Sequence, residues 1–356
     1  TTELEHARAY HEILSLLQAR TGHDFSQYKN NTIARRIERR MAVHLIDDLF
    51  EYVAFVDENK MEAHALFKEL LIGVTSFFRD AAAFDALKIA IADMVRRKQD
   101  GEPFRVWVPG CSTGEEAYSI AILVHECVQA EGKRLPVHVF GTDIDEDAVD
   151  RARKGLYPAS VQADITAERL RRYFTRDEGG HFQINKLIRA MLIFAVQDAT
   201  KDPPFSRLDL VACRNLLIYL SANLQSHLFS VFHYSLRPRG LLFLGSSESV
   251  GTSELFDCED RKHKLFRSKP VVPSRNTVLE LSRMTDGTPA RARPASLTVE
   301  SEQRSKMLFR AILQHSDAPP CVVVDHEMNV VYVHGRTGQF LEPPEGTTSV
   351  NIVDMA

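Results

Sequence analysis

Between residues 81 and 268 the sequence alternates short apolar runs with stretches of helical periodicity. The runs are FRVWV, VHVFGTDI, AMLIFAVQD, LDLVACRN and GLLFLGSSE. Apolar runs of about four to eight residues are typical of buried strands, and strands that alternate with helices form a mostly parallel sheet covered on both faces. The sequence therefore predicts an α/β domain with a doubly wound, Rossmann-like sheet over residues 81–268.

The flanking segments follow other patterns. Residues 1–75 place apolar residues three or four apart, as in ILSLLQAR and LFEYVAFV, which predicts an all-helical bundle in which LFKELLIG ends at a capping glycine. Residues 172–193 carry a glycine turn and short alternating segments, which indicates a small β subdomain inserted in the α/β domain. Residues 269–300 are rich in Pro, Ser, Thr and Arg, as linkers are. Residues 301–356, with VVVDHEMNVVYVHG, resemble the start of a PAS-like α+β sensor domain.

Composition narrows the class of protein. The 356 residues carry 44 basic and 48 acidic side chains, for a net charge of -4, so no overall basic excess favours a nucleic-acid partner. The five cysteines are widely spaced and form no C-x-x-C pair, which favours a reducing compartment and neither a disulfide framework nor a metal site. No apolar run reaches the ~18 residues of a membrane span. We expect a cytoplasmic protein, without membrane insertion. Since Thr1 is not a methionine and the sequence stops within folded-looking sequence, we expect a piece of a longer chain.

The turn after the first strand, PGCSTGEE, indicates the kind of ligand. Gly110 and Gly114 permit positive φ and close approach of a ligand, and a helix that begins near Glu115 offers unpaired N–H groups. The turn matches neither G-x-G-x-x-G nor a phosphate loop, and Glu115 and Glu116 stand where a phosphate would approach. A ligand with a positive amino group and no phosphate, such as S-adenosylmethionine, fits better. The alternative is that both glutamates only complement the helix dipole, worth ~0.3 to 1 kcal/mol each.

Polar residues also follow the next strands. Asp143 ends the second strand, where an acid accepts hydrogen bonds from ribose hydroxyls in nucleotide-binding folds. The alternative is a helix N-cap, a role open to Asp143 or Asp145. Arg214 and Asn215 end the fourth strand and face the expected crevice, or else serve as a helix cap and a surface charge.

The segment DPPF at residues 202–205 matches the [DN]PP[FY] signature of enzymes that methylate amide or adenine nitrogens. In those enzymes the signature follows the fourth strand, whereas here it precedes LDLVACRN. We interpret Pro203 and Pro204 as residues that stiffen a loop. A nucleic-acid methyltransferase would also need a basic channel, and none is apparent in the sequence.

Six motifs occur together in order: VTSFFRD, GCSTGEEAYSIAI, GTDID, FxxQD, CRNLLIYL and LLFLGSSES. Over residues 8–268 the sequence resembles the CheR-type chemotaxis receptor methyltransferases. The resemblance implies methyl transfer from S-adenosylmethionine to glutamate side chains in the cytoplasmic domains of methyl-accepting receptors, which leaves S-adenosylhomocysteine. With its PAS-like end, the chain also resembles hybrid proteins that join a CheB-type esterase, a CheR-type domain and PAS domains. A CheB-type esterase, as partner or fused domain, and a receptor tail peptide are therefore expected partners.

The resemblance implies roles for individual residues. Thr75 and Arg79 match a cofactor-contacting threonine and an active-site arginine, Glu116 matches the acid that binds the methionine amino group, and Asp143 matches the ribose-binding acid. Asp198 stands near the adenine, where the family usually has asparagine. The whole expected cofactor set is Thr75, Arg79, Gly110, Glu116, Asp143, Asp198, Arg214 and Asn215. The chain departs from the family at Gly73, where asparagine is common.

The remaining expected residues concern the substrate. Tyr219, in the family's RNxxIY motif, is expected near the methyl group and is, with Arg79, a candidate catalytic residue. In NNTIARRIERRM, Arg35, Arg36, Arg39 and Arg40 have the spacing of one basic helix face. The resemblance implies that this face engages acidic receptor helices, with Arg36 and Arg39 as the best matches. The alternative is a solvated helix face.

The chemistry explains why the sequence lacks a general-base cluster. A glutamate with a pKa of ~4.3 is ionised at neutral pH, so methyl transfer to it needs alignment and no base. The alternative function is a catalytically silent S-adenosylmethionine-binding signalling module coupled to the PAS-like segment.

Overall fold

The computed structural model describes residues 2–71, 73–251, 253–270, 321–324 and 330–334. The chain divides into two compact units, Thr1–Thr285 and Asp286–Ala356. In the second unit, β11 (Cys321–Val324) and β12 (Val330–His334) form an antiparallel pair within the predicted PAS-like segment. The rest of the predicted PAS-like segment, and nearly all of the predicted linker, lie outside the described residues.

The N-terminal part of the first unit is all-helical, as predicted. It contains α1 (Thr2–Thr21), α2 (Asn30–His44), α3 (Leu49–Glu58) and α4 (Lys60–Leu70). Asp48 and Asn59 cap α3 and α4 by accepting bonds from backbone N–H groups, and Phe25 lies at the centre of the apolar core. One expectation is wrong: α4 ends at Leu70 and continues in extended backbone, so Gly73 does not cap it.

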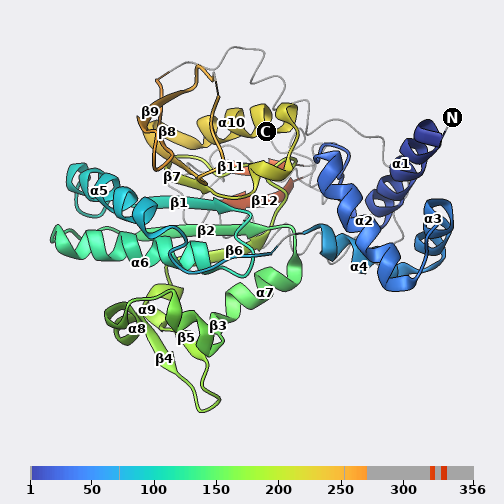
Figure 1. Cartoon of the computed structure of the whole chain (residues 1–356). Helices are drawn as coiled ribbons and strands as arrows, with labels where there is room; N and C mark the ends of the chain where they lie inside the picture. Colours follow the sequence, from blue (N-terminus) through green and yellow to red (C-terminus); the bar gives the residue numbers. More distant parts are fainter. Residues whose placement is uncertain (1, 72, 252, 271–320, 325–329, 335–356) are drawn as a thin grey trace, which may run out of the picture. The chain divides into compact units, whose positions relative to one another are not determined.

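A seven-stranded sheet follows, in the order β6-β2-β1-β7-β8-β10-β9 (Figure 1). Its strands are β1 (Phe104–Pro109), β2 (Val137–Asp143), β6 (Leu192–Val196), β7 (Leu208–Cys213), β8 (Leu236–Leu244), β9 (Phe256–Asp260) and β10 (Leu265–Ser268). The strands from β6 to β8 pair in parallel, and β10 is antiparallel to both neighbours. The predicted Rossmann-like class is confirmed. The β9–β10 hairpin was not predicted, because FDCEDRKHKLFRS carries too many charges to show an apolar run.

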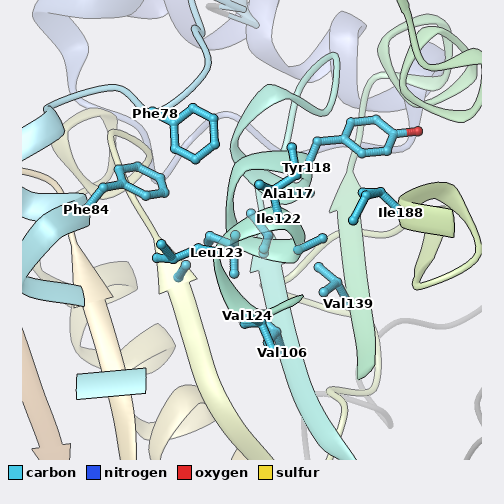
Figure 2. Packing of buried hydrophobic residues seen from close by; sticks show 14 of the residues in the cluster. Phe78, Phe84, Val106, Ala117, Tyr118, Ile122, Leu123, Val124, Val139 and Ile188 are labelled. Atoms are coloured by element: carbon cyan, nitrogen blue, oxygen red, sulfur yellow. The ribbon is translucent and has the colours of Figure 1, made fainter. Parts of the chain in front are cut away.

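Helices cover both faces of this sheet. The main ones are α5 (Ala81–Arg97), α6 (Glu115–Ala130), α7 (Glu146–Lys154) and α10 (Ala222–Ser235). Figure 2 shows Ile122 and Val124 of α6 packed over Val106 of β1 and Val139 of β2. On the opposite face of β1, the Trp107 ring meets Phe232 of α10 at a centroid distance of 5.7 Å. Successive side chains of β1 point to opposite faces of the sheet, and all of them are buried. Helices therefore have to cover the sheet on both faces.

A second, three-stranded antiparallel sheet is inserted between β2 and β6. It consists of β3 (Leu156–Tyr157), β5 (Phe182–Ile184) and β4 (Phe174–Arg176), with η1 (Ala159–Ala163), α8 (Ala167–Tyr173) and α9 (Lys186–Arg189). The predicted β insertion is therefore present, and it includes a strand that precedes the predicted range 172–193. Phe77 joins it to the main domain, with its ring 5.5 Å from that of Phe174.

Candidate active site

A cavity lies at the carboxyl ends of the parallel strands. It has about 850 Å³ of empty space when the open solvent at its mouth is counted, and it receives side chains from both the helical domain and the sheet. Of the predicted site residues, its lining includes Gly110, Asp143, Asp198, Asn215 and Tyr219. Open α/β sheets bind their ligands at this edge.

The glycine turn between β1 and α6 has two distinct roles. Gly110 has φ +68°, and a Cβ there would lie 3.2 Å from Leu216 Cδ2, so the glycine lets Leu216 pack closely beside it in the cavity lining. Gly114 has φ +95°, and a Cβ there would lie 2.8 Å from Ala152 Cβ on α7. Gly110 therefore serves the cavity, and Gly114 serves helix packing.

Asp143 and Asp145 divide the two roles that the sequence left open. Asp145 caps α7 by accepting from the N–H groups of Asp147 and Ala148. Asp143 accepts from the N–H of Ser112 at 2.7 Å and of Asp145 at 3.0 Å, and it lines the cavity. Burial raises the pKa of Asp143 above its ordinary value, although the two backbone hydrogen bonds act to lower it. Asp143 is therefore a half-buried acceptor at the edge of the cavity.

Glu116 is held in an ion pair. Arg214 Nη1 lies 3.1 Å from Glu116 Oε2, and the Arg214 side chain is only 3% exposed. Burial raises the pKa of Glu116, and the charge of Arg214 opposes this rise. Arg214 Nε is buried and makes no hydrogen bond to any described residue. Glu116 is therefore more than a complement to the helix dipole, and Arg214 is no surface charge.

Asn215 does not cap a helix. Ser221 caps α10, and Asn215 adopts φ +61° at the start of a loop that ends in η2 (Leu217–Tyr219). Glu248 holds this loop: its carboxylate accepts from the N–H groups of Asn215 at 3.0 Å, Leu217 at 2.8 Å and Gly245 at 2.7 Å. Sequence reasoning missed Glu248, although an acid just after the apolar run GLLFL was a usable signal.

The helical domain contributes two polar cavity residues that were not predicted, His23 and Tyr28, beside Leu70 and Leu71. His23 Nδ1 lies 2.9 Å from Asp198 Oδ2, and His23 Nε2 lies 3.1 Å from the Tyr28 hydroxyl. Burial raises the pKa of Asp198, but hydrogen bonds from His23 and Thr200 outweigh it and lower the value to about 2. No local pattern reveals this chain of contacts, because it joins residues 175 positions apart.

Backbone hydrogen bonds join the two domains beside the cavity. The N–H of Lys29 donates to Tyr219 O at 2.8 Å, and the N–H of Ser221 donates to Gln27 O at 2.8 Å. Tyr28 and Leu220 form the β-bridge between them. We call these two short segments, residues 27–29 and 219–221, the domain seam.

Tyr219 also lines a second hollow. Its lining consists of Asn31, Thr32, Arg35, Arg36, Arg39 and Tyr219. Arg36 and Arg39 both reach Glu69 Oε1, at 3.0 and 3.1 Å. Arg40 does not belong to this basic face, because it points into the helical domain and binds Glu62. Three arginines against one glutamate leave the hollow positively charged.

The remaining predicted residues lie outside the cavity lining. Arg79 is exposed and donates to Val74 O at 3.2 Å, and its charge acts on Glu116 after the larger effects of burial and Arg214. Thr75 is half-buried in the same segment, and among the described residues the structure brings Gly73 but not Thr75 to the cavity.

Two features are absent from the described residues. Within them, no three His, Cys, Asp or Glu side chains gather in a way that would hold a metal ion. None of the described helices combines the length and the apolar character needed to cross a membrane.

Comparisons with known proteins match both domains. Residues 8–71 match the family described as CheR methyltransferase, all-alpha domain, and residues 73–265 match CheR methyltransferase, SAM binding domain. The proteins named Chemotaxis protein methyltransferase of Salmonella typhimurium and Escherichia coli are each 32% identical. The first match covers 67% of this chain and 83% of that protein, and the second covers 69% and 85%.

A longer relative matches nearly the whole chain. It is an "Uncharacterized 104.1 kDa protein in hypE 3'region" of Rhodobacter capsulatus, 32% identical over 98% of this chain, which spans only 36% of that protein. The solved structure of DszA carbon methyltransferase is similar at a TM-score of 0.29 and 15% identity, over 60% of this chain and 46% of that chain. From the two family matches and the cavity at the strand ends, we conclude that the chain belongs to the CheR methyltransferase family and carries its S-adenosylmethionine-binding domain.

Proposed function

We propose that this chain transfers the methyl group of S-adenosylmethionine to glutamate side chains in the cytoplasmic domains of methyl-accepting chemotaxis receptors. The products are a glutamyl methyl ester and S-adenosylhomocysteine. The observation that carries this proposal is the position of Tyr219, which lines both the cavity at the strand ends and the arginine-lined hollow. Methyl donor and acidic acceptor would then meet at a single side chain.

The residues around the cavity fit the cofactor. Asp143 is a half-buried acceptor whose carboxylate has lone pairs left for ribose hydroxyls. Glu116 would hold the positive amino group, and the unpaired Nε of Arg214 indicates a missing anionic partner, which the methionine carboxylate would supply. Gly110, Asn215 and Asp198 complete the proposed binding set, and Thr75 and Arg79 would join it from the segment before α5.

The main requirement of this methyl transfer is that the glutamate carboxylate be aligned with the methyl group. When bound, S-adenosylmethionine supplies a methyl group on a positively charged sulfur. A bond forms between a glutamate oxygen and the methyl carbon, the bond from that carbon to sulfur breaks with its electron pair left on sulfur, and no proton moves. Arg79 and Tyr219 would orient the carboxylate and exclude water, and such alignment is worth on the order of 7 to 11 kcal/mol. Arg79 is expected to orient without fully neutralising the carboxylate, since a tight ground-state pair would slow the reaction.

The arginine-lined hollow supports an acidic substrate. Arg36 and Arg39 share one carboxylate, so a receptor helix rich in glutamate gains from contact with them. We propose that these two residues bind the receptor.

The wider organisation is also a proposal. We propose that residues 1–75 and 81–268 are the two domains of the transferase, that 269–300 is a linker and 301–356 a partial PAS-like domain, and that the protein works in the cytoplasm. The R. capsulatus relative, of which this chain spans 36%, supports a longer chain that includes other domains. A CheB-type esterase, fused or separate, and a receptor tail peptide remain proposed partners.

The test is mass spectrometry of cytoplasmic receptor fragments incubated with this protein and S-adenosylmethionine. We expect glutamates that gain the mass of a methyl ester, and we expect Arg79→Ala to abolish this gain while S-adenosylhomocysteine still binds. Fragments that stay unmodified although the cofactor binds would overturn the proposal and favour a silent signalling module. Full turnover in Arg79→Ala would overturn only the role of Arg79.

A further inference from the structure

Arg79 lies between two residues whose backbone is left-handed. Phe78 has φ +49° and Asp80 has φ +66°. For a bulky aromatic residue a positive φ costs free energy, so this conformation persists only where the surroundings hold it. The two residues set the direction in which the exposed Arg79 side chain leaves the main chain. We call residues 77–80 the Arg79 segment.

The main chain of this segment is tied to the elements that carry the proposed cofactor site. The N–H of Phe78 donates to Ser119 Oγ at 2.9 Å, and the Ser119 hydroxyl donates to Glu115 O at 2.7 Å. Ser119 is fully buried in α6. Its oxygen can accept from Phe78 while its hydrogen is engaged with the helix. At the other end of the segment, Asp80 Oδ2 lies 3.9 Å from Arg214 Nη2.

The inserted β subdomain holds two side chains of the segment. The ring of Phe77 lies 4.8 Å from that of Tyr157. The Arg169 guanidinium, from α8, lies over the Phe78 ring, 4.1 Å from its centroid. The same ring packs against Phe84 of α5 at a centroid distance of 5.4 Å (Figure 2). The attraction between a guanidinium and an aromatic face favours this position of the Phe78 ring.

Arg169 is itself fixed, by a bidentate ion pair with Glu126 of α6. Arg169 Nε lies 2.9 Å from Glu126 Oε1, and Arg169 Nη2 lies 2.7 Å from Glu126 Oε2. Only 20% of the Arg169 side chain and 15% of the Glu126 side chain are exposed. A bidentate pair fixes the plane of the guanidinium as well as its charge. Arg169 therefore presents a flat cation of fixed orientation to the residue that precedes Arg79.

We propose that Arg169 is a positioning residue for Arg79 and acts through the ring of Phe78. The guanidinium holds the ring, the ring helps to hold the left-handed backbone of Phe78, and this backbone aims the Arg79 side chain at the incoming carboxylate. The inference rests on the proposed function, in which Arg79 orients the acceptor glutamate. It gives the inserted β subdomain a part in turnover.

The experiment is steady-state methyl transfer to receptor fragments by the whole chain, together with calorimetric titration of S-adenosylhomocysteine. We expect Arg169→Met to lower kcat roughly tenfold, as for the loss of one partly buried cation–ring contact. The KM for the fragments and the affinity for S-adenosylhomocysteine should stay within about twofold of the wild type, because only the alignment of the carboxylate is lost.

Arg172→Met is the matched control. It removes an arginine of the same helix, α8, whose side chain binds Gln129 of α6, and it should turn over as the wild type does. Three results overturn the inference: an unchanged kcat in Arg169→Met, an equal loss of kcat in both variants, or a loss that comes from weaker cofactor binding.

A second variant separates the ring contact from the effect of an unpaired carboxylate. Arg169→Met leaves Glu126 without its guanidinium, which destabilises α6 in its own right. The double variant Arg169→Met with Glu126→Gln carries no such charge, and we expect it to keep the loss of kcat. Recovery of the wild-type kcat in this double variant would contradict the inference.

A double-mutant cycle tests the route through Phe78. Phe78→Leu removes the ring on which Arg169 acts, so we expect Arg169→Met to lower kcat little further when it is combined with Phe78→Leu. Independent effects would multiply. A double variant whose loss of kcat equals the product of the two single losses would show that Arg169 acts by another route, and the inference would be wrong.

Hydrogen exchange gives a readout that needs no methyl transfer. The Phe78 N–H should exchange faster in Arg169→Met than in Arg172→Met. If the wild type methylates no receptor fragment, the proposed function fails, and the exchange still tests whether Arg169 holds the Arg79 segment. If the wild type methylates the fragments and neither kcat nor exchange responds to Arg169→Met, only the inference fails. Thermal unfolding of each variant shows that the protein tested is folded.

Discussion

Glu248 sets the shape of the loop that carries Asn215 and Tyr219. Its side chain is buried and accepts hydrogen bonds from backbone N–H groups in the segments that follow the paired strands β7 and β8. Burial raises the pKa of Glu248, and these donors oppose the rise. A carboxylate can accept from several donors at once, whereas an amide has only one oxygen. The left-handed conformation of Asn215 depends on this carboxylate.

We predict that Glu248→Gln weakens S-adenosylhomocysteine binding and slows methyl transfer, each by roughly tenfold or more, because a buried N–H left unpaired costs ~1 to 3 kcal/mol. Calorimetry and a radiolabelled methyl-transfer assay measure the two effects. Glu254→Gln, at an exposed position of the same region, is the control. A Glu248→Gln protein with wild-type affinity would show that the loop keeps its shape without the carboxylate.

At the scale of elements, α2 presents a different chemistry on each side. Arg40 points inward to Glu62, whereas Arg35, Arg36 and Arg39 line the outer hollow with Tyr219. The spacing of four arginines predicts a single basic face, but the structure divides them. The spacing of arginines along a helix shows which side of the helix each one occupies. It does not show which neighbouring helix carries the carboxylate that pairs with it.

We predict that Arg39→Glu raises the KM for receptor fragments by roughly three- to tenfold at low salt and less at high salt, since the lost attraction is screened. The kcat and the affinity for S-adenosylhomocysteine should change little, because Arg39 lies outside the cavity lining. Arg8→Glu, at an exposed position of α1, is the matched control. A loss of cofactor affinity in Arg39→Glu would contradict a role confined to the receptor.

At the scale of the whole molecule, one buried carboxylate ties the helical domain together. Glu62 accepts from Arg40 at 2.9 Å, Tyr52 at 2.7 Å and His44 at 2.7 Å, and it is only 2% exposed. Burial raises the pKa of Glu62, but the three partners outweigh it, and the net shift is downward. A carboxyl group whose pKa is lower in the folded state stabilises the fold above its unfolded pKa and loses that contribution as the pH falls through the folded value.

We predict that Glu62→Gln lowers the free energy of unfolding at neutral pH by roughly 1.5 to 3 kcal/mol, as expected for hydrogen bonds to a charged group. This deficit should shrink as the pH falls below about 4.3, the unfolded value for glutamate. Urea unfolding of the whole chain at a series of pH values measures both effects. Glu58→Gln, at an exposed position of α3, is the control. A deficit that is the same at every pH would show that the charge of Glu62 is not what stabilises the domain.

Much of this architecture could be predicted from the sequence, for a physical reason. A parallel strand buried on both faces is a continuous apolar run, so the sequence predicts β1, β2, β6, β7 and β8. The ends of these runs in turn indicate the polar residues that follow the strands, such as Asp143 and Asn215. The hairpin β9–β10 lies at the sheet edge and carries many charged residues, so it shows no apolar run from which it could be predicted. His23, Tyr28 and the Arg214 partner of Glu116 depend on how separate segments pack, and no local pattern records this.

The domain seam is made by the main chain, through Lys29 N–H with Tyr219 O and Ser221 N–H with Gln27 O. Main-chain bonds do not depend on side-chain identity, apart from the exclusion of proline at the two donors. The side chains of Gln27, Lys29 and Ser221 can therefore diverge between relatives while the two domains stay joined. The helix that begins at Asn30 is thereby free to evolve toward new substrates without losing its alignment with the loop that ends at Tyr219.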